Sequence, residues 1–421
     1  MRILFLSHYF PPEVNAPANR THEHCREWAA AGHEVHVITC VPSHPVGKPF
    51  PGYRTGWYSH ECIDGIHVHR VWTYLAANRG IARRTLNFLS FVPSAIFRAL
   101  RLGRFDVVIG TSPQFFCAAA TWLFATMRGV PWVFELRDLW PESIPAVGAM
   151  GKSWMLTALE KLELRMYRDA AAVVCVTRSF IRNLSERGIE PSKLSFIPNG
   201  IMPSFWNAAE RTRARARAGV ADHEVVASYV GTIGMAHGLG TVLDAAAMLR
   251  DAAPAVKFWI VGDGAELERL KADAAKRALT NVHFTGLVAR EDIPSILAGS
   301  DISLVTLRPS DVFKTVLPSK MFESMAARRA IVLAVDGEAR ETLQRAEAGV
   351  AVPPGDATAL AGAIARLAAN PDERQRMGEA GGRFVEREFS RRAFAEQYIQ
   401  LLESLASATV SELPAPETTL N

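Results

Sequence analysis

Short apolar or β-branched runs alternate with helical stretches along most of this chain, and the alternation begins twice. The first series of expected strands comprises residues 2–7, 34–39, 66–70, 107–110, 132–136, 173–176 and 194–197. The second comprises residues 225–230, 257–261, 282–285, 302–306, 330–334 and 349–352. Turn residues or a helical pattern follow each run, which is typical of a doubly wound parallel sheet. The sequence therefore predicts an α/β fold of two Rossmann-like domains that face each other, with ligands in the cleft at the carboxyl ends of the strands.

The length of 421 residues fits two domains, because a single core seldom grows beyond about 250–300 residues. We expect the first domain over residues 1–200 and the second over residues 201–383, with the IPNG turn at the boundary and an Arg-rich helical stretch from Arg211. A helix over residues 384–406 should pack back toward the first domain. Residues 407–421 have the composition of a flexible tail.

Charge and cysteine content narrow the classes of function. The 47 basic and 43 acidic residues leave a net charge of only +4, so nothing global favours a nucleic-acid partner. The five cysteines include no C-x-x-C pair, which argues against a disulfide framework and favours a reducing compartment. The short N-terminal apolar run is typical of a buried strand rather than a signal peptide, and no apolar window of about 18 residues occurs. We therefore expect a cytoplasmic protein without a transmembrane span.

Metal ligands are not expected either. His67 and His69 alternate on one expected strand and share a face, whereas His22 and His24 lie about 200° apart on a helix and cannot converge. Neither pair has a third ligand at metal spacing, and the chain contains no D-x-D pair. These histidines are interpreted as surface or structural residues, and no metal site is predicted.

Three turns follow expected strands directly and precede helices. Residues 8–18 (HYFPPEVNAPA) lead into a helix, whose first amides attract anions. The turns GTIG, residues 231–234, and GDG, residues 262–264, suit a tight bend with clustered N–H groups. The candidate contacts in these turns are Asn15, Ala16, Gly231, Thr232, Gly234, Gly262 and Gly264. Each turn is also explained as a simple connection, so both interpretations stay open.

Residues 308–334 (RPSDVFKTVLPSKMFESMAARRAIVLA) form the most informative segment. Pro318 suits the first turn of a helix that continues to Ala327. Such a helix start would present free amides and Lys320 toward an anion, and Glu323 could accept both hydroxyls of a ribose diol. Spacing alone favours the alternative, a solvent-exposed glutamate on an amphipathic helix. The candidate contacts here are Leu317, Pro318, Ser319, Lys320 and Glu323.

The stretch Asn78–Arg104 combines six arginines with a run of large apolar side chains. Basic flanks around an apolar core suit a helix that lies at the surface of an anionic membrane. The alternative is a core-packed helix pair with solvated arginines, and the sequence leaves both open.

The order of several motifs resembles one known family. HYFPPE and GHEVHVIT are followed by IPNGI, YVGTIG, IVGDG, NVHFTG and PSKMFESMA. Together they look like a retaining glycosyltransferase of GT-B fold from the large family 4, and are most similar to bacterial cell-surface polysaccharide transferases such as the L-fucosamine and colanic-acid transferases. The resemblance covers almost the whole chain. It implies a C-terminal domain that holds a nucleotide sugar and an N-terminal domain on the acceptor side.

The resemblance also assigns roles to single residues. Glu323 matches the second glutamate of the family's E-x7-E motif, the ribose ligand, whereas the first glutamate falls at Thr315. Asp138, after a central strand of the first domain, is the implied polar contact to the donor sugar. Asn199 and Gly200 match the family's interdomain turn.

The phosphate end of the site departs from the family pattern. The Arg and Lys that many relatives place after the strand-end glycine correspond here to Thr232 and His237. A leaving diphosphate still needs fixed positive charge, so Lys320, Lys314 or Arg308 has to supply it.

The implied reaction is attack of an acceptor hydroxyl on the anomeric carbon, with retention by a front-face route and without metal or cofactor. The expected donor is a UDP-linked hexose-type sugar, such as an N-acetylated 6-deoxyhexose. The expected acceptor is a glycan or a polyprenyl-diphosphate-linked sugar, reached at the inner face of the cytoplasmic membrane with help from Asn78–Arg104. Two alternatives remain: a nucleotide-sugar epimerase of the same architecture, and a nucleotide-sugar-binding subunit without catalysis, which the departures from the family pattern keep open.

Overall fold

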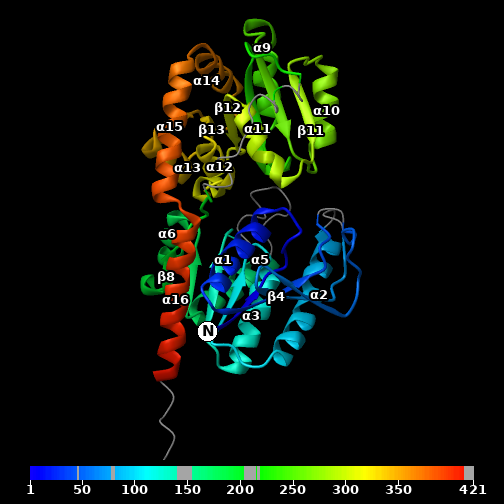
Figure 1. The fold of residues 1–421 in the computed structure, drawn as a ribbon, viewed down its shortest axis with the longest axis vertical. Helices are drawn as coiled ribbons and strands as arrows, with labels where there is room; N and C mark the ends of the chain where they lie inside the picture. The colour runs from blue at the N-terminus through cyan, green and yellow to red at the C-terminus, as the bar shows by residue number, and fades with distance from the viewer. Residues whose placement is uncertain (45–46, 77–80, 140–153, 203–214, 216–218, 412–421) are drawn as a thin grey trace, which may run out of the picture. The chain divides into compact units, whose positions relative to one another are not determined.

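In the computed structural model of this chain, the described residues are 1–44, 47–76, 81–139, 154–202, 215 and 219–411. They divide into two compact units, each built on a sheet of its own (Figure 1). The second unit comprises Asn199–Arg391, and the first comprises the rest of the described chain. The chain therefore passes from one unit to the other at Pro198–Asn199 and again at Arg391–Arg392.

The first unit contains an eight-stranded sheet of order β3-β4-β2-β1-β5-β6-β7-β8. Its strands are β1 (Arg2–Leu6), β2 (Glu34–Cys40), β3 (Tyr58–Ile63), β4 (Ile66–Val71), β5 (Val107–Thr111), β6 (Trp132–Leu136), β7 (Ala172–Cys175) and β8 (Leu194–Phe196). Neighbouring strands are parallel except β3, which is antiparallel to β4. Its helical elements are α1 (Ala16–Ala30), α2 (Ile81–Arg101), α3 (Phe115–Arg128), α5 (Trp154–Asp169), α6 (Arg178–Glu186), η1 (Pro191–Lys193) and α16 (Arg391–Ser411).

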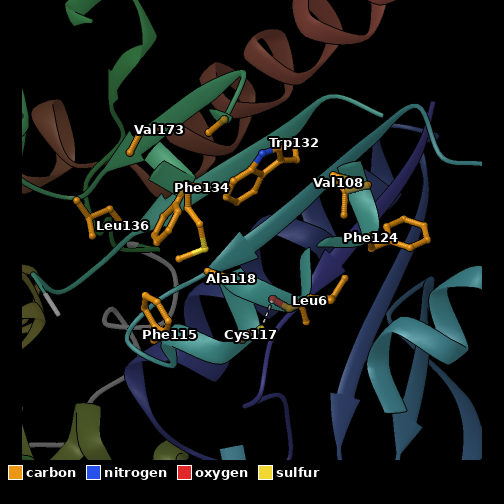
Figure 2. Packing of buried hydrophobic residues seen from close by; sticks show 14 of the residues in the cluster. Leu6, Val108, Phe115, Cys117, Ala118, Phe124, Trp132, Phe134, Leu136 and Val173 are labelled. Carbon is orange, nitrogen blue, oxygen red and sulfur yellow. Dashed lines mark hydrogen bonds between the residues drawn. The ribbon is translucent and has the colours of Figure 1, made fainter. Parts of the chain in front are cut away.

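Both faces of this sheet are covered, because side chains alternate along each strand. Leu4 and Leu6 of β1 belong to one buried cluster, and Ile3 and Phe5 belong to another on the opposite face. Figure 2 shows part of the first cluster, in which α3 packs its apolar side chains against β5 and β6. The Cys117 thiol there donates to the carbonyl of Leu6 at 3.1 Å. The long apolar strands predicted from the sequence are thus the buried layer of the unit.

The second unit contains a six-stranded, wholly parallel sheet of order β11-β10-β9-β12-β13-β14. Its strands are β9 (Val225–Val230), β10 (Val256–Val261), β11 (Val282–Gly286), β12 (Ile302–Thr306), β13 (Ala330–Ala334) and β14 (Gly349–Ala351). Its helical elements are η2 (Met235–His237), α9 (Gly240–Ala252), α10 (Leu267–Lys276), η3 (Arg290–Asp292), α11 (Ile293–Gly299), η4 (Val312–Thr315), α12 (Ser319–Ala326), α13 (Glu338–Ala346), α14 (Ala357–Ala369) and α15 (Pro371–Glu388). The chain proceeds from β9 to β10 and β11 on one side, then returns to place β12 on the other side. Ligands of such sheets lie at this switch point, outside the carboxyl ends of β9 and β12.

The expected strands are all present, and β3 is the strand that the sequence did not predict. Its residues, YSHECI, are polar and mostly exposed, because β3 is an edge strand. An edge strand does not need the apolar run or clean alternation on which strand prediction rests.

The end of the chain differs from the expected single helix over 384–406. Helix α15 already begins at Pro371 and ends at Glu388, and α16 begins at Arg391. Between them, Ser390 forms a parallel bridge with Ile201, and this pairing takes the backbone out of the helix. Residues 78–80 of the basic stretch, the start of the helical stretch expected from Arg211, and residues 412–421 of the expected tail lie outside the described residues.

Candidate functional site

The loops at the carboxyl ends of β9 and β10 are packed backbone against backbone. Gly231 has φ +141° and Gly262 has φ +132°. A Cβ on Gly262 would lie 2.0 Å from the carbonyl oxygen of Gly231, and a Cβ on Gly264 would lie 2.3 Å from that of Ile233. Glycine is required here because the two loops approach each other closely.

Several amides of these loops are engaged within the protein. The N–H groups of Gly231 and Ile233 donate to the carbonyls of Val261 and Asp263, both at 2.9 Å. The N–H of Gly264 donates to the Asp263 carboxylate at 2.7 Å. The expectation that these glycine turns offer a free N–H cluster is therefore wrong for these amides. Their glycines join two loops into one platform.

Helix α12 places Lys320 over this platform. Pro318 is the N-cap residue, with φ −62°, so the helix begins one residue later than predicted. The Lys320 ammonium donates to the Tyr229 hydroxyl at 2.6 Å and lies 3.9 Å from the centre of the Tyr229 ring. Burial lowers the pKa of Lys320 to about 7, although the nearby Glu323 carboxylate acts in the opposite direction.

Glu323 lies one turn further along α12, close to a small cavity. Burial raises the pKa of its carboxyl against the opposing charges of Arg290 and Lys320. Ser228 and Ser303, opposite each other on β9 and β12, also line the cavity. Their hydroxyls are buried and have no hydrogen-bond partner among the described residues. The carboxylate therefore faces a polar recess, and the solvent-exposed alternative for Glu323 is wrong.

His237 closes the loop that begins at Gly231. Its Nδ1 accepts a hydrogen bond from the N–H of Gly234 at 3.3 Å, so its Nε2 carries the ring proton. Burial and the charge of Lys320 lower the pKa of His237 to about 3. The imidazole is therefore a neutral donor at physiological pH and does not replace the missing cation.

The other two candidate cations have different surroundings. Lys314 is exposed and forms an ion pair with Asp311 at 2.7 Å. Arg308 is exposed next to η2, where its backbone N–H donates to the carbonyl of Ala236 at 2.9 Å. Thr315, at the place of the first family glutamate, donates its hydroxyl to the carbonyl of Val312 within η4. Lys320 is thus the candidate cation that the fold holds at the switch point.

Comparison with known proteins identifies the family and the fold of this chain. The family described as "Glycosyl transferase 4-like domain" matches residues 15–200, and the family described as "Glycosyl transferases group 1" matches residues 210–384. Together they span most of the chain. This chain is a family-4 glycosyltransferase of GT-B fold.

Two curated relatives have similar sequences. The transferase is 29% identical over 337 residues to the putative colanic acid biosynthesis glycosyl transferase WcaI of Escherichia coli strain K12. The alignment covers 77% of this chain and 81% of the relative. It is 28% identical over 279 residues to the probable glycosyltransferase WbjE of Pseudomonas aeruginosa, which covers 62% of this chain and 66% of the relative.

Solved structures share the fold. A sucrose-phosphate synthase from Thermosynechococcus elongatus aligns with a TM-score of 0.77 at 20% identity, covering 97% of the transferase and 99% of the synthase. HepE from Anabaena, solved in complex with UDP-glucose, aligns with a TM-score of 0.73 at 16% identity, covering 96% of the transferase and 100% of HepE. At these identities the likeness concerns the fold alone.

Three of the predicted site residues lie in the first unit of the transferase. Asn15 is the N-cap of α1, where its side-chain oxygen accepts from the N–H of Ala18 at 2.9 Å, and Ala16 is the first helical residue. Asp138 follows β6 and is half-buried. Lys320 and Glu323 lie in the second unit, together with the glycine loops. The predicted residues of the second unit thus form one cluster, and Asn15, Ala16 and Asp138 belong to the first unit.

Tyr229 is the site residue that the sequence analysis missed. It is fully buried within β9, and its hydroxyl donates to the carbonyl of Thr232 at 2.6 Å. Its only sequence signal is an aromatic residue two places before the strand-end glycine, a place where an ordinary core residue is equally expected.

Within the described residues, the basic stretch of the transferase contains a single helix, α2, with Pro93 inside it. Its inner side chains, such as Phe91, are buried, whereas Leu86, Leu89 and Phe97 are 51%, 44% and 57% exposed. The helix contains no acidic residue. The alternative of a core-packed helix pair is therefore wrong, and one helix combines a core face with an exposed apolar, basic face. None of the described helices is long and apolar enough to span a membrane.

Four histidines stack on the sheet of the first unit. The rings of His36 and His69 lie 5.3 Å apart and nearly parallel, and those of His60 and His69 lie 4.8 Å apart. His67 stacks on His36 at 4.9 Å. Within the described ranges, no group of three or more His, Cys, Asp or Glu residues could hold a metal ion. His67 and His69 share a face, as predicted, and their contacts are structural.

Proposed function

We propose that the transferase moves a hexose-type sugar from a UDP-linked donor to a glycan or polyprenyl-diphosphate-linked acceptor in bacterial surface polysaccharide synthesis. The main observation behind this proposal is that the Lys320 ammonium lies at the carboxyl end of β9, with the Glu323 carboxyl one helical turn away. The names of the colanic acid relative and of the UDP-glucose complex of HepE support the acceptor class and the nucleotide. An N-acetylated 6-deoxyhexose is our preferred donor sugar.

In this proposal each end of the donor has its own partner. The Glu323 carboxylate accepts the two hydroxyls of the ribose. Lys320 stabilises the diphosphate, which gains negative charge as the sugar leaves. The Nε2 proton of His237 offers a neutral hydrogen bond to the same phosphates. The start of α12 at Ser319, directly after Leu317 and Pro318, adds the positive end of a helix dipole.

We propose a reaction with retention and without metal or cofactor. The acceptor hydroxyl attacks the anomeric carbon on the face from which the diphosphate leaves, and the departing phosphate oxygen takes the hydroxyl proton. The bond from the anomeric carbon to the phosphate oxygen breaks as the bond to the acceptor oxygen forms. Asp138 contacts the donor sugar, and the start of α1 at Asn15 and Ala16 contributes to the donor site from the first unit.

A panel of nucleotide sugars tests the donor class. A ligand that binds only the folded state raises the melting temperature. We expect UDP-linked sugars to give the largest shift among UDP-, GDP-, ADP- and dTDP-linked donors. Absence of a shift with every donor would contradict the proposal, and a larger shift with another base would replace UDP.

Replacing Lys320 tests the leaving-group role. We expect Lys320→Ala to lower kcat about 100- to 1,000-fold, the usual loss when one stabilising donor is removed from a developing negative charge. Lys314→Ala is the matched control, because Lys314 is exposed and paired with Asp311. If the turnover of Lys320→Ala is close to that of Lys314→Ala, the leaving-group role of Lys320 is contradicted.

Assays with donor alone and with donor plus acceptors separate the transferase from its two alternatives. An epimerase converts the donor or releases its sugar without any acceptor. A binding subunit without catalysis binds the donor but turns over none of a panel of lipid-linked acceptors. Formation of a new glycosidic bond only when an acceptor is present supports the proposal.

We further propose that the transferase works in the cytoplasm and contacts anionic membrane through α2. The exposed Leu86, Leu89 and Phe97 give an apolar strip, and exposed Arg83 and Arg84 lie at the same helix start. Apolar side chains beside arginines are what a peripheral helix needs to lie among anionic headgroups. Such contact would bring the enzyme to an acceptor that is anchored in the bilayer.

A further inference from the structure

Among the described residues, the hydrogen-bond partner of the Lys320 ammonium is Tyr229. The phenol oxygen accepts from the Lys320 ammonium at 2.6 Å, and the phenol proton is donated to the Thr232 carbonyl at 2.6 Å. Because an ammonium only donates and a backbone carbonyl only accepts, the direction of both hydrogen bonds is fixed. The chain ammonium–phenol–carbonyl therefore has one possible polarity.

The ring of Tyr229 makes a second contact with the same ammonium. The Lys320 Nζ lies 3.9 Å from the ring centre, within the range of a cation–π interaction. Its hydroxyl contact and its ring contact both favour the charged form of Lys320, in a place where burial disfavours it.

Gly231 leaves the space that the ammonium occupies. A Cβ on Gly231 would lie 3.1 Å from Nζ of Lys320, closer than ordinary van der Waals contact. The ammonium thus lies against the backbone at the end of β9, where the phosphates of ligands bind in sheets of this kind.

We propose that Tyr229 is a positioning residue that fixes the Lys320 ammonium for the donor diphosphate and keeps it protonated there. This inference rests on the proposed function of the site. Tyr229 itself touches no reacting atom: its side chain is buried, and it acts through Lys320.

The test is Tyr229→Phe, which keeps the ring and its packing and removes only the hydroxyl. A hydrogen bond to a charged group is lost, so we expect UDP to bind about tenfold more weakly. Uridine, which has the ribose and base without phosphates, should bind as it does to the unmodified enzyme. Equal weakening for UDP and uridine, or no change for either, would overturn the inference.

The pH profile gives a second readout that a merely structural role would not move. Turnover that needs protonated Lys320 falls as the pH rises through the pKa of this group. Without the hydroxyl the pKa of Lys320 falls further, so the basic limb of kcat/KM should move to lower pH in Tyr229→Phe. An unmoved basic limb contradicts the inference.

Tyr398→Phe is the matched control. Tyr398 is fully buried in the first unit, and its hydroxyl has no hydrogen-bond partner among the described residues. Both substitutions remove one buried hydroxyl, and only Tyr229→Phe should change UDP binding. Equal melting temperatures of the two variants exclude a folding defect as the cause.

Lys320→Ala distinguishes failure of this inference from failure of the proposed function. If Lys320→Ala leaves UDP binding unchanged, the proposed phosphate role of Lys320 fails, and the positioning role fails with it. If Lys320→Ala weakens UDP binding and Tyr229→Phe does not, only the positioning role fails. The double variant should bind UDP no more weakly than Lys320→Ala, because Tyr229 acts through Lys320.

Discussion

At the scale of single residues, the site places two ionisable groups where burial disfavours their charged forms. Burial lowers the pKa of Lys320 to about 7 and raises the pKa of Glu323, so each is pushed toward its neutral form. A diphosphate beside Lys320 would reverse this effect, because an adjacent negative charge favours the ammonium. Donor binding above neutral pH should therefore be accompanied by proton uptake at Lys320.

Gly262 carries the clearest steric prediction. Because its φ is +132° and a Cβ would collide with the Gly231 carbonyl, Gly262→Ala should destabilise the protein by at least about 2 kcal/mol. Gly362→Ala is the control: Gly362 lies inside α14 with nothing within 4 Å of a Cβ, so alanine should stabilise by about 0.5–1 kcal/mol. Melting temperatures of both variants measure the difference. A Gly262→Ala protein as stable as the parent would show that the loops can separate.

The sequence predicted some site residues and missed others for physical reasons. Lys320 and Glu323 could be proposed from the sequence because a helix start with a cation and a carboxylate one turn apart is a local pattern. Tyr229 was missed because its contact with Lys320 joins residues 91 positions apart. The prediction of free amides in the Gly231 turn was wrong. A single turn does not reveal that carbonyls at the end of β10 and in the loop after it accept hydrogen bonds from those amides.

At the scale of elements, α2 serves the core and the surface at once. Its inner face closes one side of the sheet, and its outer face exposes three large apolar side chains among arginines. The sequence contained both patterns but did not assign them to opposite faces of one helix, which continues through Pro93.

Charge reversal on α2 tests the membrane proposal. Arg83→Glu with Arg84→Glu should abolish binding to vesicles that contain phosphatidylglycerol, because the surface attraction is lost and like charges repel. Arg383→Glu with Arg387→Glu on α15 changes the net charge equally and should retain binding. Cosedimentation with vesicles measures both. Undiminished binding of the α2 variant would refute the contact.

The histidine stack is an element that links stability to pH. Burial, then the charges of His36 and Arg98, lower the pKa of His69 to about 3, and burial also lowers that of His36. An unfolded histidine has a pKa of about 6.5, and these folded histidines have lower pKa values. At pH values between the two, the unfolded chain therefore binds more protons than the folded chain. The contribution of the neutral histidines to the free energy of unfolding is complete above about pH 6.5 and is lost as the pH falls toward their folded pKa values.

His69→Phe keeps a stacking ring and removes the titrating group. Its melting temperature should fall less between pH 7 and pH 5 than that of the parent. His283→Phe, at an exposed place on β11, should leave the parental slope unchanged. The buried His8 and His24 contribute to the slope of every variant. Identical slopes for the parent and His69→Phe would contradict the account.

At the scale of the whole molecule, the two series of strands became two sheets with their predicted strands. Parallel strands buried on both faces carry a strong apolar signal, which explains why their positions followed from the sequence. The strand order did not follow, because crossing from β2 and β4 to β5 on the far side of β1 leaves no local trace. From Arg392 onward, the last helix belongs to the first unit.

That return has a consequence for how the protein is made. Helix α16 supplies Tyr398 and Leu402 to the core around Ile3 and Phe5, and Trp28 donates to the carbonyl of Ala395 at 3.0 Å. During translation the second unit emerges as one uninterrupted segment, Asn199–Arg391, while the first lacks this helix until α16 has left the ribosome. A nascent chain usually completes its domains from the N-terminus onward. Of these two units, the one whose synthesis begins first is the one that can complete its core last.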